Sequence, residues 1–246
     1  MIGKKIIHLD SVDSTNNYVA NMLLTNQIEH GTVILADEQT AGKGQRGNVW
    51  HSKSGENIIT SIYLKTANLS VNHQFYLTIF SSLSVIRILK KKGIKAQIKW
   101  PNDIVVGSKK IAGILIENQL KYTSIEHCII GIGLNTNQKN FSDFNATSIF
   151  NETNEFIPIH HILLSLISEM NQIFIDIENE NFEKLKVEYL ENLWLLKTQS
   201  SYTDQTGDFI GEIIGVSELG LLQMMKDNQL KEYNLKEIKF NSRNGF

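Results

Sequence analysis

The glycine segment "QTAGKGQRGNVW", residues 39–50, has the spacing of two known glycine loops, and its surroundings fit neither of them. It follows "GTVILAD", an apolar and β-branched run that predicts a strand leading into the glycines. Gly42, Gly44 and Gly47 have the G-x-G-x-x-G spacing of a dinucleotide-binding turn, in which the third glycine opens a helix. Here Gly47 is followed by "NVWHSKSGEN", which has turn formers and no helical periodicity. A kinase loop is excluded as well, because neither H-R-D nor D-F-G occurs in the chain.

The same segment fits an anionic ligand. Glycines allow close backbone approach and can expose N–H groups to an anion. Lys43 and Arg46 add positive charge, and Trp50 offers a flat face to a base or ring. A solvated, flexible loop is the alternative interpretation. The formal net charge of −2 gives no domain-wide basic surface, so an anion site must be local.

Cysteine usage and hydropathy suggest a cytoplasmic protein. The single cysteine, Cys128, lies in the apolar run "CIIGIG", which predicts a buried thiol and rules out an internal disulfide. The apolar stretch near the N-terminus is too short for a signal peptide, and no window reaches membrane-spanning length. We therefore expect no membrane partner.

The spacing of apolar residues predicts an α+β fold. Strands are expected at 4–10, 31–37, 58–65, 96–106, 109–120 and 124–135, with a Gly107-Ser108 turn joining the strands on its two sides. Helices are expected at 15–24 after an N-cap at Ser14, at 73–93 with Gly93 as its C′ residue, and at 157–177, followed by another that ends near 192. From about Leu195 short strands broken by glycine predict a small β-barrel. The predicted domains are therefore 1–194 and 195–246.

Polar residues interrupt two of these strands. Pro101 breaks the strand at 96–106, and Asn102 and Asp103 follow it. A turn explains them, and a site for a ribose, or for a phosphate through Mg²⁺, is the alternative.

Small residues mark the next two strands. Lys110 precedes Gly113, and Gly131 and Gly133 would leave room for a ligand along a strand. Asn135 lies at the end of that strand.

Five motifs in this order resemble those of biotin–protein ligases. They are "DSTNN" at 13–17, "QTAGKGQRGNVW", "KWPNDI", "KKIAGILIE" and "GIGLN". The resemblance is strong over about residues 7–135. It implies a catalytic domain with a mixed sheet packed with helices, as in biotin and lipoate ligases, and a C-terminal SH3-like β-barrel.

The resemblance implies an ATP-dependent enzyme. Biotin is activated as biotinyl-5′-AMP and then passed to a lysine of the biotin carboxyl carrier domain of a biotin-dependent carboxylase. ATP and Mg²⁺ would be needed, and biotin would be the substrate. A lipoate or octanoate ligase or transferase of the same fold is one alternative, and a non-catalytic biotin-binding regulatory protein is another.

The resemblance also assigns roles to individual residues. It makes Lys110, Arg46 and Lys43 catalytic, and Asp103 a magnesium ligand. The nucleotide would meet Arg46, Trp50, Asn102 and Asn135, with Trp50 stacked near adenine once the loop closes. Biotin would meet Ser14, Thr15, Asn16, Gln39, Gly42, Lys43, Gly44, Gln45, Lys110, Gly113, Gly131 and Gly133.

The chain departs from the family pattern in two respects. The family commonly has arginine where this chain has Lys43 and Gln45. No helix-turn-helix precedes the first motif at Asp13, so no DNA binding is expected. The sequence leaves the oligomeric state open, with a homodimer as one option.

Overall fold

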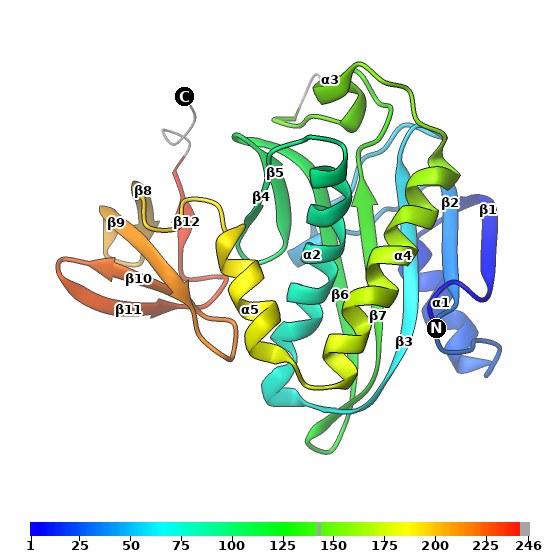
Figure 1. Ribbon diagram of the computed structural model, residues 1–246, viewed down its shortest axis with the longest axis horizontal. Coiled ribbons are helices and arrows are strands. Elements are labelled where there is room, and N and C mark those ends of the chain that lie inside the picture. Colours follow the sequence, from blue (N-terminus) through cyan, green and yellow to red (C-terminus); the bar gives the residue numbers. More distant parts are fainter. Residues whose placement is uncertain (142–143, 242–246) are drawn as a thin grey trace.

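The main body of the protein is a seven-stranded mixed sheet (Figure 1). The structure, a computed structural model, describes residues 1–141 and 144–241, without the side chains of Arg46, Ala67 and Asn68. The strand order is β1-β2-β3-β7-β6-β5-β4; β1 runs parallel to β2, and all other neighbours are antiparallel. The strands are β1 (Ile6–Val12), β2 (Val33–Gln39), β3 (Ile58–Ser70), β4 (Ala96–Lys99), β5 (Asp103–Val106), β6 (Lys109–Lys121) and β7 (Ser124–Leu134).

Helices cover both faces of this sheet. Helices α2 (Phe75–Lys91) and α4 (Ile159–Glu178) pack side by side on one face, and α5 (Phe182–Glu191) lies beside α2 (Figure 1). Their apolar sides and the strands beneath them form the large core, with Phe80, Leu83 and Leu166 fully buried. Helix α1 (Thr15–Leu24) covers the other face, where Val19 anchors a smaller apolar cluster. Three short helical segments complete this part: η1 (Gln45–Gly47), η2 (Val71–His73) and α3 (Ile149–Thr153).

A second, smaller sheet follows the last helix. Its five strands are all antiparallel, in the order β11-β10-β9-β8-β12 (Figure 1). They are β8 (Gln199–Asp204), β9 (Gly207–Val216), β10 (Leu222–Lys226), β11 (Gln229–Tyr233) and β12 (Lys239–Phe240). The expected α+β class with a small C-terminal β-unit is therefore confirmed. We propose a domain boundary at 194–195, because Trp194 still bonds to β4 while the next strand, β8, belongs to the second sheet.

The individual helices follow the sequence closely. The first predicted helix has the observed bounds of α1. Helix α2 ends at Lys91, and Gly93 follows its C-cap as the predicted C′ residue, with a φ of +75°. Ser14 does occupy the N-cap position, but its side chain makes no capping hydrogen bond. Among the helices of the described residues, none combines the length and the apolarity that a bilayer crossing requires.

The run 96–106 is two strands rather than one. Strands β4 and β5 pair with each other as a hairpin, and the tight turn between them holds Trp100, Pro101 and Asn102. The Trp100–Pro101 peptide bond is cis. The Gly107-Ser108 turn was predicted correctly, since it connects β5 to its neighbour β6.

Candidate active site

A cavity of about 260 Å³ opens over the middle of the main sheet. Its walls come from the start of α1, the end of β2, the glycine segment, the β4–β5 turn and the central strands β3, β6 and β7. Most of the predicted site residues meet in this wall: Ser14, Thr15, Asn16, Gln39, Lys43, Gly44, Gln45, Trp50, Asn102, Asp103, Lys110, Gly113, Gly131 and Gly133. Predicted site residues up to about 120 positions apart in the sequence therefore line one cavity.

The floor of the cavity is bare backbone because three glycines share one face of the sheet. Gly113 on β6 lies directly opposite Gly133 on β7, and Gly131 lies two residues before Gly133. Side chains alternate between the two faces of a strand, so Gly131 and Gly133 face the same side. A Cβ at Gly131 would lie 2.5 Å from Asn16 Oδ1, and a Cβ at Gly133 would lie 2.4 Å from Trp50 Cε2. The glycines are thus required for side chains of the opposite wall to approach the sheet.

A chain of polar groups closes one end of the cavity. The backbone N–H of Thr15 donates to Gln39 Oε1 at 2.8 Å, and the Thr15 hydroxyl lies 3.0 Å from the same oxygen. Ser61 Oγ on β3 lies 2.6 Å from Thr15 Oγ1 and 2.5 Å from Asn16 Oδ1. Asn16 Nδ2 donates to Glu117 Oε2 at 2.7 Å. These bonds fix the orientation of the donors and acceptors at this end of the cavity.

Ser61 and Glu117 were missed by the sequence prediction. Ser61 is buried in a strand whose other residues are mainly apolar, so a polar residue within "IITSIYLK" was the available signal. Glu117 is exposed near the end of "KKIAGILIE" and offered no such signal. Ser61 pairs with Gly131 in the sheet, and so it stands beside the bare floor. We infer that it orients Thr15 and Asn16.

The other end of the cavity carries an ion pair. Lys110 Nζ lies 2.6 Å from Asp103 Oδ1, and each side chain is 37% exposed. The backbone of Lys110 is held on both sides, because its N–H donates to the Asn145 carbonyl and its own carbonyl accepts from Thr147 N–H. A half-exposed pair of this kind contributes little to stability. The Lys110 ammonium can therefore exchange Asp103 for an arriving anion at small cost.

The glycine segment is folded over the cavity. Lys43 and Val49 form a β-bridge, Trp50 N–H donates to the Gly42 carbonyl at 3.0 Å, and Lys43 Nζ donates to Asn17 Oδ1 at 2.5 Å. The sequence suggested that the glycines expose their N–H groups to an anion. The N–H of Gly44 instead donates to the Asn48 carbonyl at 2.7 Å, because the segment closes on itself as a small hairpin.

The indole of Trp50 lies on the glycine floor. Its ring carbons face Gly133 and Gly113, and Lys110 Nζ lies 5.6 Å from the ring centroid. Its Nε1–H is buried and has no hydrogen-bond partner within the described structure. Trp50 also borders a second cavity of about 370 Å³ that contains His51 and Phe144. Trp50 thus borders both cavities, and its indole fills part of the floor that the glycines leave free.

Three predicted site residues do not contribute a described side chain to the main cavity wall. Gly42 lines the second cavity. Asn135 Nδ2 donates to the Thr147 carbonyl at 2.9 Å, so its amide braces the segment behind Lys110. The side chain of Arg46 lies outside the described residues, and its predicted role stays a prediction.

The chemistry of the donors decides which metal the cavity could hold. Asp103 is the one carboxylate in the described wall, and the described residues contain no cluster of three or more His, Cys, Asp or Glu able to hold an ion. Mg²⁺ is often held by one or two carboxylates together with substrate phosphates. The residues therefore fit a magnesium ion that arrives with a nucleotide, and they do not form a cage for a resident metal.

The second sheet closes one side of the cavity. Leu235, which follows β11, lies in the wall, and Trp100 Nε1 donates to the Gly220 carbonyl of the β9–β10 turn at 3.0 Å. A Cβ at Gly220 would lie 2.4 Å from the Phe75 ring of α2. The sequence prediction had no residue of the second sheet in the site, because nothing in the sequence pairs Leu235 with residues more than a hundred positions earlier.

A mixed sheet with a glycine floor, a polar end and a cationic end forms a site suited to a small ligand that carries an anionic group. The comparison with family models identifies the class of enzyme. The model of the biotin/lipoate A/B protein ligase family matches residues 9–135, and the chain belongs to this family.

The similarity to two individual proteins extends beyond residues 9–135 to most of this chain. The bifunctional ligase/repressor BirA of Bacillus subtilis is 31% identical over 243 residues, which cover 94% of this chain and 73% of that protein. The biotin–[acetyl-CoA-carboxylase] ligase of Mycobacterium tuberculosis is 30% identical over 112 residues, or 44% of this chain and 40% of that protein. The structure of the biotin protein ligase from Aquifex aeolicus in complex with biotin and ATP has a TM-score of 0.79 at 26% identity, covering 97% of this chain and 99% of that chain.

Proposed function

We propose that this chain is a biotin–protein ligase that activates biotin with ATP and transfers it to a lysine of a carrier domain. The observation that carries the proposal is the cavity, in which a polar end and a Lys110 end lie at opposite sides of one glycine floor. Support comes from its likeness to a protein that binds both biotin and ATP. The carrier as partner is supported by the name of the Mycobacterium tuberculosis relative.

The proposed first step joins a carboxylate to a phosphate. The biotin carboxylate attacks the α-phosphorus of ATP, the bond to the β-phosphate oxygen breaks, and pyrophosphate leaves with biotinyl-5′-AMP retained. Two anions must come together, and fixed cations and donors offset their repulsion. Lys110 is suited to this role because its ammonium already lies beside the floor with an exchangeable partner. When bound, Mg²⁺ would neutralise the phosphates, with Asp103 as its ligand from this chain.

The polar end is proposed to hold the ureido ring of biotin. A cyclic urea has both N–H donors and a carbonyl acceptor, and Thr15, Asn16 and Gln39 offer complementary groups. Ser14, Lys43, Gly44 and Gln45 complete this proposed contact set from the edge of the cavity. In the second step the carrier's lysine amine attacks the acyl carbon of the adenylate. AMP then leaves, and an amide bond forms.

The cellular location, the absence of DNA binding and the oligomeric state are also proposals. A cytoplasmic location is supported by the lone cysteine, Cys128, which is buried and free. The net charge of −2 argues against DNA binding by this chain. A homodimer could form at β1, which has one neighbour in its sheet, and sedimentation would test it.

Product analysis distinguishes the candidate functions. The purified chain is incubated with ATP, Mg²⁺, a carrier domain and either biotin, lipoate or octanoate. We expect biotin to label the carrier on an avidin blot, with pyrophosphate released. Labelling by lipoate or octanoate alone would make the chain a lipoate-type ligase. Binding of biotin without pyrophosphate release would make it a regulatory protein.

A further inference from the structure

The β4–β5 turn presents Asn102 and Asp103 to the cavity, and its own attachments determine where these side chains lie. Trp100 Nε1 ties the turn to Gly220, and Asn102 Nδ2 ties it to the Ile114 carbonyl of β6 at 2.5 Å. The third tie comes from outside the cavity. The hydroxyl of Tyr189 donates to the Pro101 carbonyl at 2.9 Å.

The surroundings of Tyr189 fix its side chain as a hydrogen-bond donor. It is fully buried on α5, and its ring meets Phe75 edge-on with the centroids 5.5 Å apart. Burial raises the pKa of the Tyr189 hydroxyl, which keeps the group protonated and able to donate. Neither the ring nor the hydroxyl lines the main cavity.

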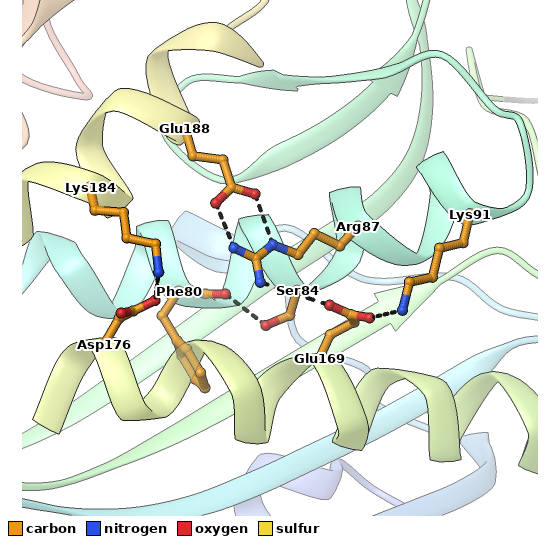
Figure 2. A network of polar contacts seen from close by, with 8 residues as sticks. All are labelled: Phe80, Ser84, Arg87, Lys91, Glu169, Asp176, Lys184 and Glu188. Carbon is orange, nitrogen blue, oxygen red and sulfur yellow. Dashed lines mark hydrogen bonds and ion pairs between the residues drawn. The ribbon is translucent and has the colours of Figure 1, made fainter. Parts of the chain in front are cut away.

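Helix α5 is itself fixed to the rest of the protein immediately before Tyr189. Arg87 on α2 donates to both carboxylate oxygens of Glu188, at 2.8 and 2.6 Å, and its Nη1 lies 3.9 Å from Glu169 on α4 (Figure 2). Bidentate arginine–carboxylate pairs add geometric specificity that single contacts lack. The guanidinium therefore joins three helices at the residue that precedes the tyrosine.

The chain is fixed again just after α5. Ile98 N–H of β4 donates to the Asn192 carbonyl, and Trp194 N–H donates to the Ile98 carbonyl, each at 2.8 Å. Tyr189 is thus held between an ion pair and a backbone bridge. The bridge joins the strand that leads into the turn, so α5 and the turn form one connected unit.

We infer that Tyr189 is a positioning residue for the nucleotide end of the site. It holds the Pro101 carbonyl, which sets the turn so that Asn102 reaches the Ile114 carbonyl and Asp103 reaches Lys110. The inference rests on the proposed function, because the nucleotide end is defined by that function. Tyr189 does not touch the ligand, so it acts on the nucleotide and leaves the distant polar end unaffected.

The test is Tyr189→Phe, which keeps the ring and removes the hydroxyl. Tyr202→Phe, at a fully buried tyrosine of the second sheet, is the matched control. Pyrophosphate release is measured against ATP concentration at saturating biotin, and biotin binding is measured without ATP. We expect Y189F to raise the KM for ATP about five- to tenfold, the effect of one hydrogen bond, with biotin affinity within about twofold of wild type. Y202F should leave both values unchanged.

The outcomes distinguish a positioning role of Tyr189 from a contribution to protein stability alone. A lower melting temperature in Y189F with wild-type KM and kcat would overturn the inference, and so would an equal rise in KM for Y202F. If Y189F does not fold, Arg87→Lys replaces it, since lysine keeps the charge but loses the two-pronged contact with Glu188. A raised KM for ATP in R87K would support the inference, and a wild-type KM would overturn it. A wild-type chain that releases no pyrophosphate would refute the proposed function, and the nucleotide role of Tyr189 with it.

Discussion

Lys110 Nζ and Asp103 Oδ1 lie 2.6 Å apart across the β5–β6 pair, so the proposed catalytic cation and the proposed metal ligand neutralise each other. The pair keeps both charges in the cavity before any ligand arrives. Because both side chains are partly exposed, solvent screens their attraction, and a triphosphate can compete for the ammonium. Removal of Lys110 and removal of Asp103 should therefore affect adenylation in two different ways.

Lys110→Ala should slow adenylation far more than it weakens biotin binding. Loss of the cation at the developing charge removes about 2–3 kcal/mol of transition-state stabilisation, or roughly 10²-fold in rate. Pyrophosphate release measures the rate, and calorimetry measures biotin binding. Lys109→Ala is the control, because the neighbouring side chain is exposed. A wild-type rate of release from K110A would refute the assignment.

Asp103→Asn should raise the Mg²⁺ concentration needed for half-maximal activity about tenfold, the effect of losing one charged ligand. Adenylation is titrated with Mg²⁺ at fixed ATP. Asp37→Asn, at an acidic residue that pairs with His8 outside the main cavity, is the matched control. An unchanged Mg²⁺ requirement in D103N would leave Asp103 as a partner of Lys110 only.

Gly131→Ala should abolish biotin binding without unfolding the protein. The added Cβ would lie 2.5 Å from Asn16 Oδ1, so the polar end of the cavity must shift. Gly215→Ala is the control in the second sheet, where the nearest atom to a new Cβ is the end of a flexible glutamine at 3.2 Å. Calorimetry with biotin and circular dichroism on both variants test this. Normal biotin affinity in G131A would remove Asn16 from the proposed contacts.

Local sequence patterns predicted the helices and strands, and the five motifs in their order predicted most residues of the cavity wall. Helix α1 was placed to the residue because an N-cap position and an apolar period coincide there. A turn at Pro101 was one of two interpretations of the sequence, because apolar residues flank both halves of the run, and the structure confirms the turn between β4 and β5. Ser61, Tyr189 and Leu235 were not predicted, since each reaches the site or its supports through contacts between distant segments. Sequence periodicity carries no information on such contacts.

The expected stacking of Trp50 near adenine stays a prediction, and in the structure its indole lies on the glycine floor. A ligand on that floor must displace the ring, so part of the binding energy is used to move it. Removing the indole should then tighten biotin binding. Because the ring is also expected to stack on adenine, its removal should weaken nucleotide binding.

Trp50→Ala should therefore shift the two affinities in opposite directions. We expect biotin to bind about three- to tenfold more tightly, because an unpaired, buried Nε1–H makes the indole a weakly held occupant. The KM for ATP should rise by a similar factor. Trp194→Phe, at a tryptophan outside the cavity wall, is the control. Biotin should also change the intrinsic fluorescence of wild type and of W194F, and the change should be much smaller in W50A. If W50A binds biotin less tightly than wild type, the indole supports the ligand and does not compete with it.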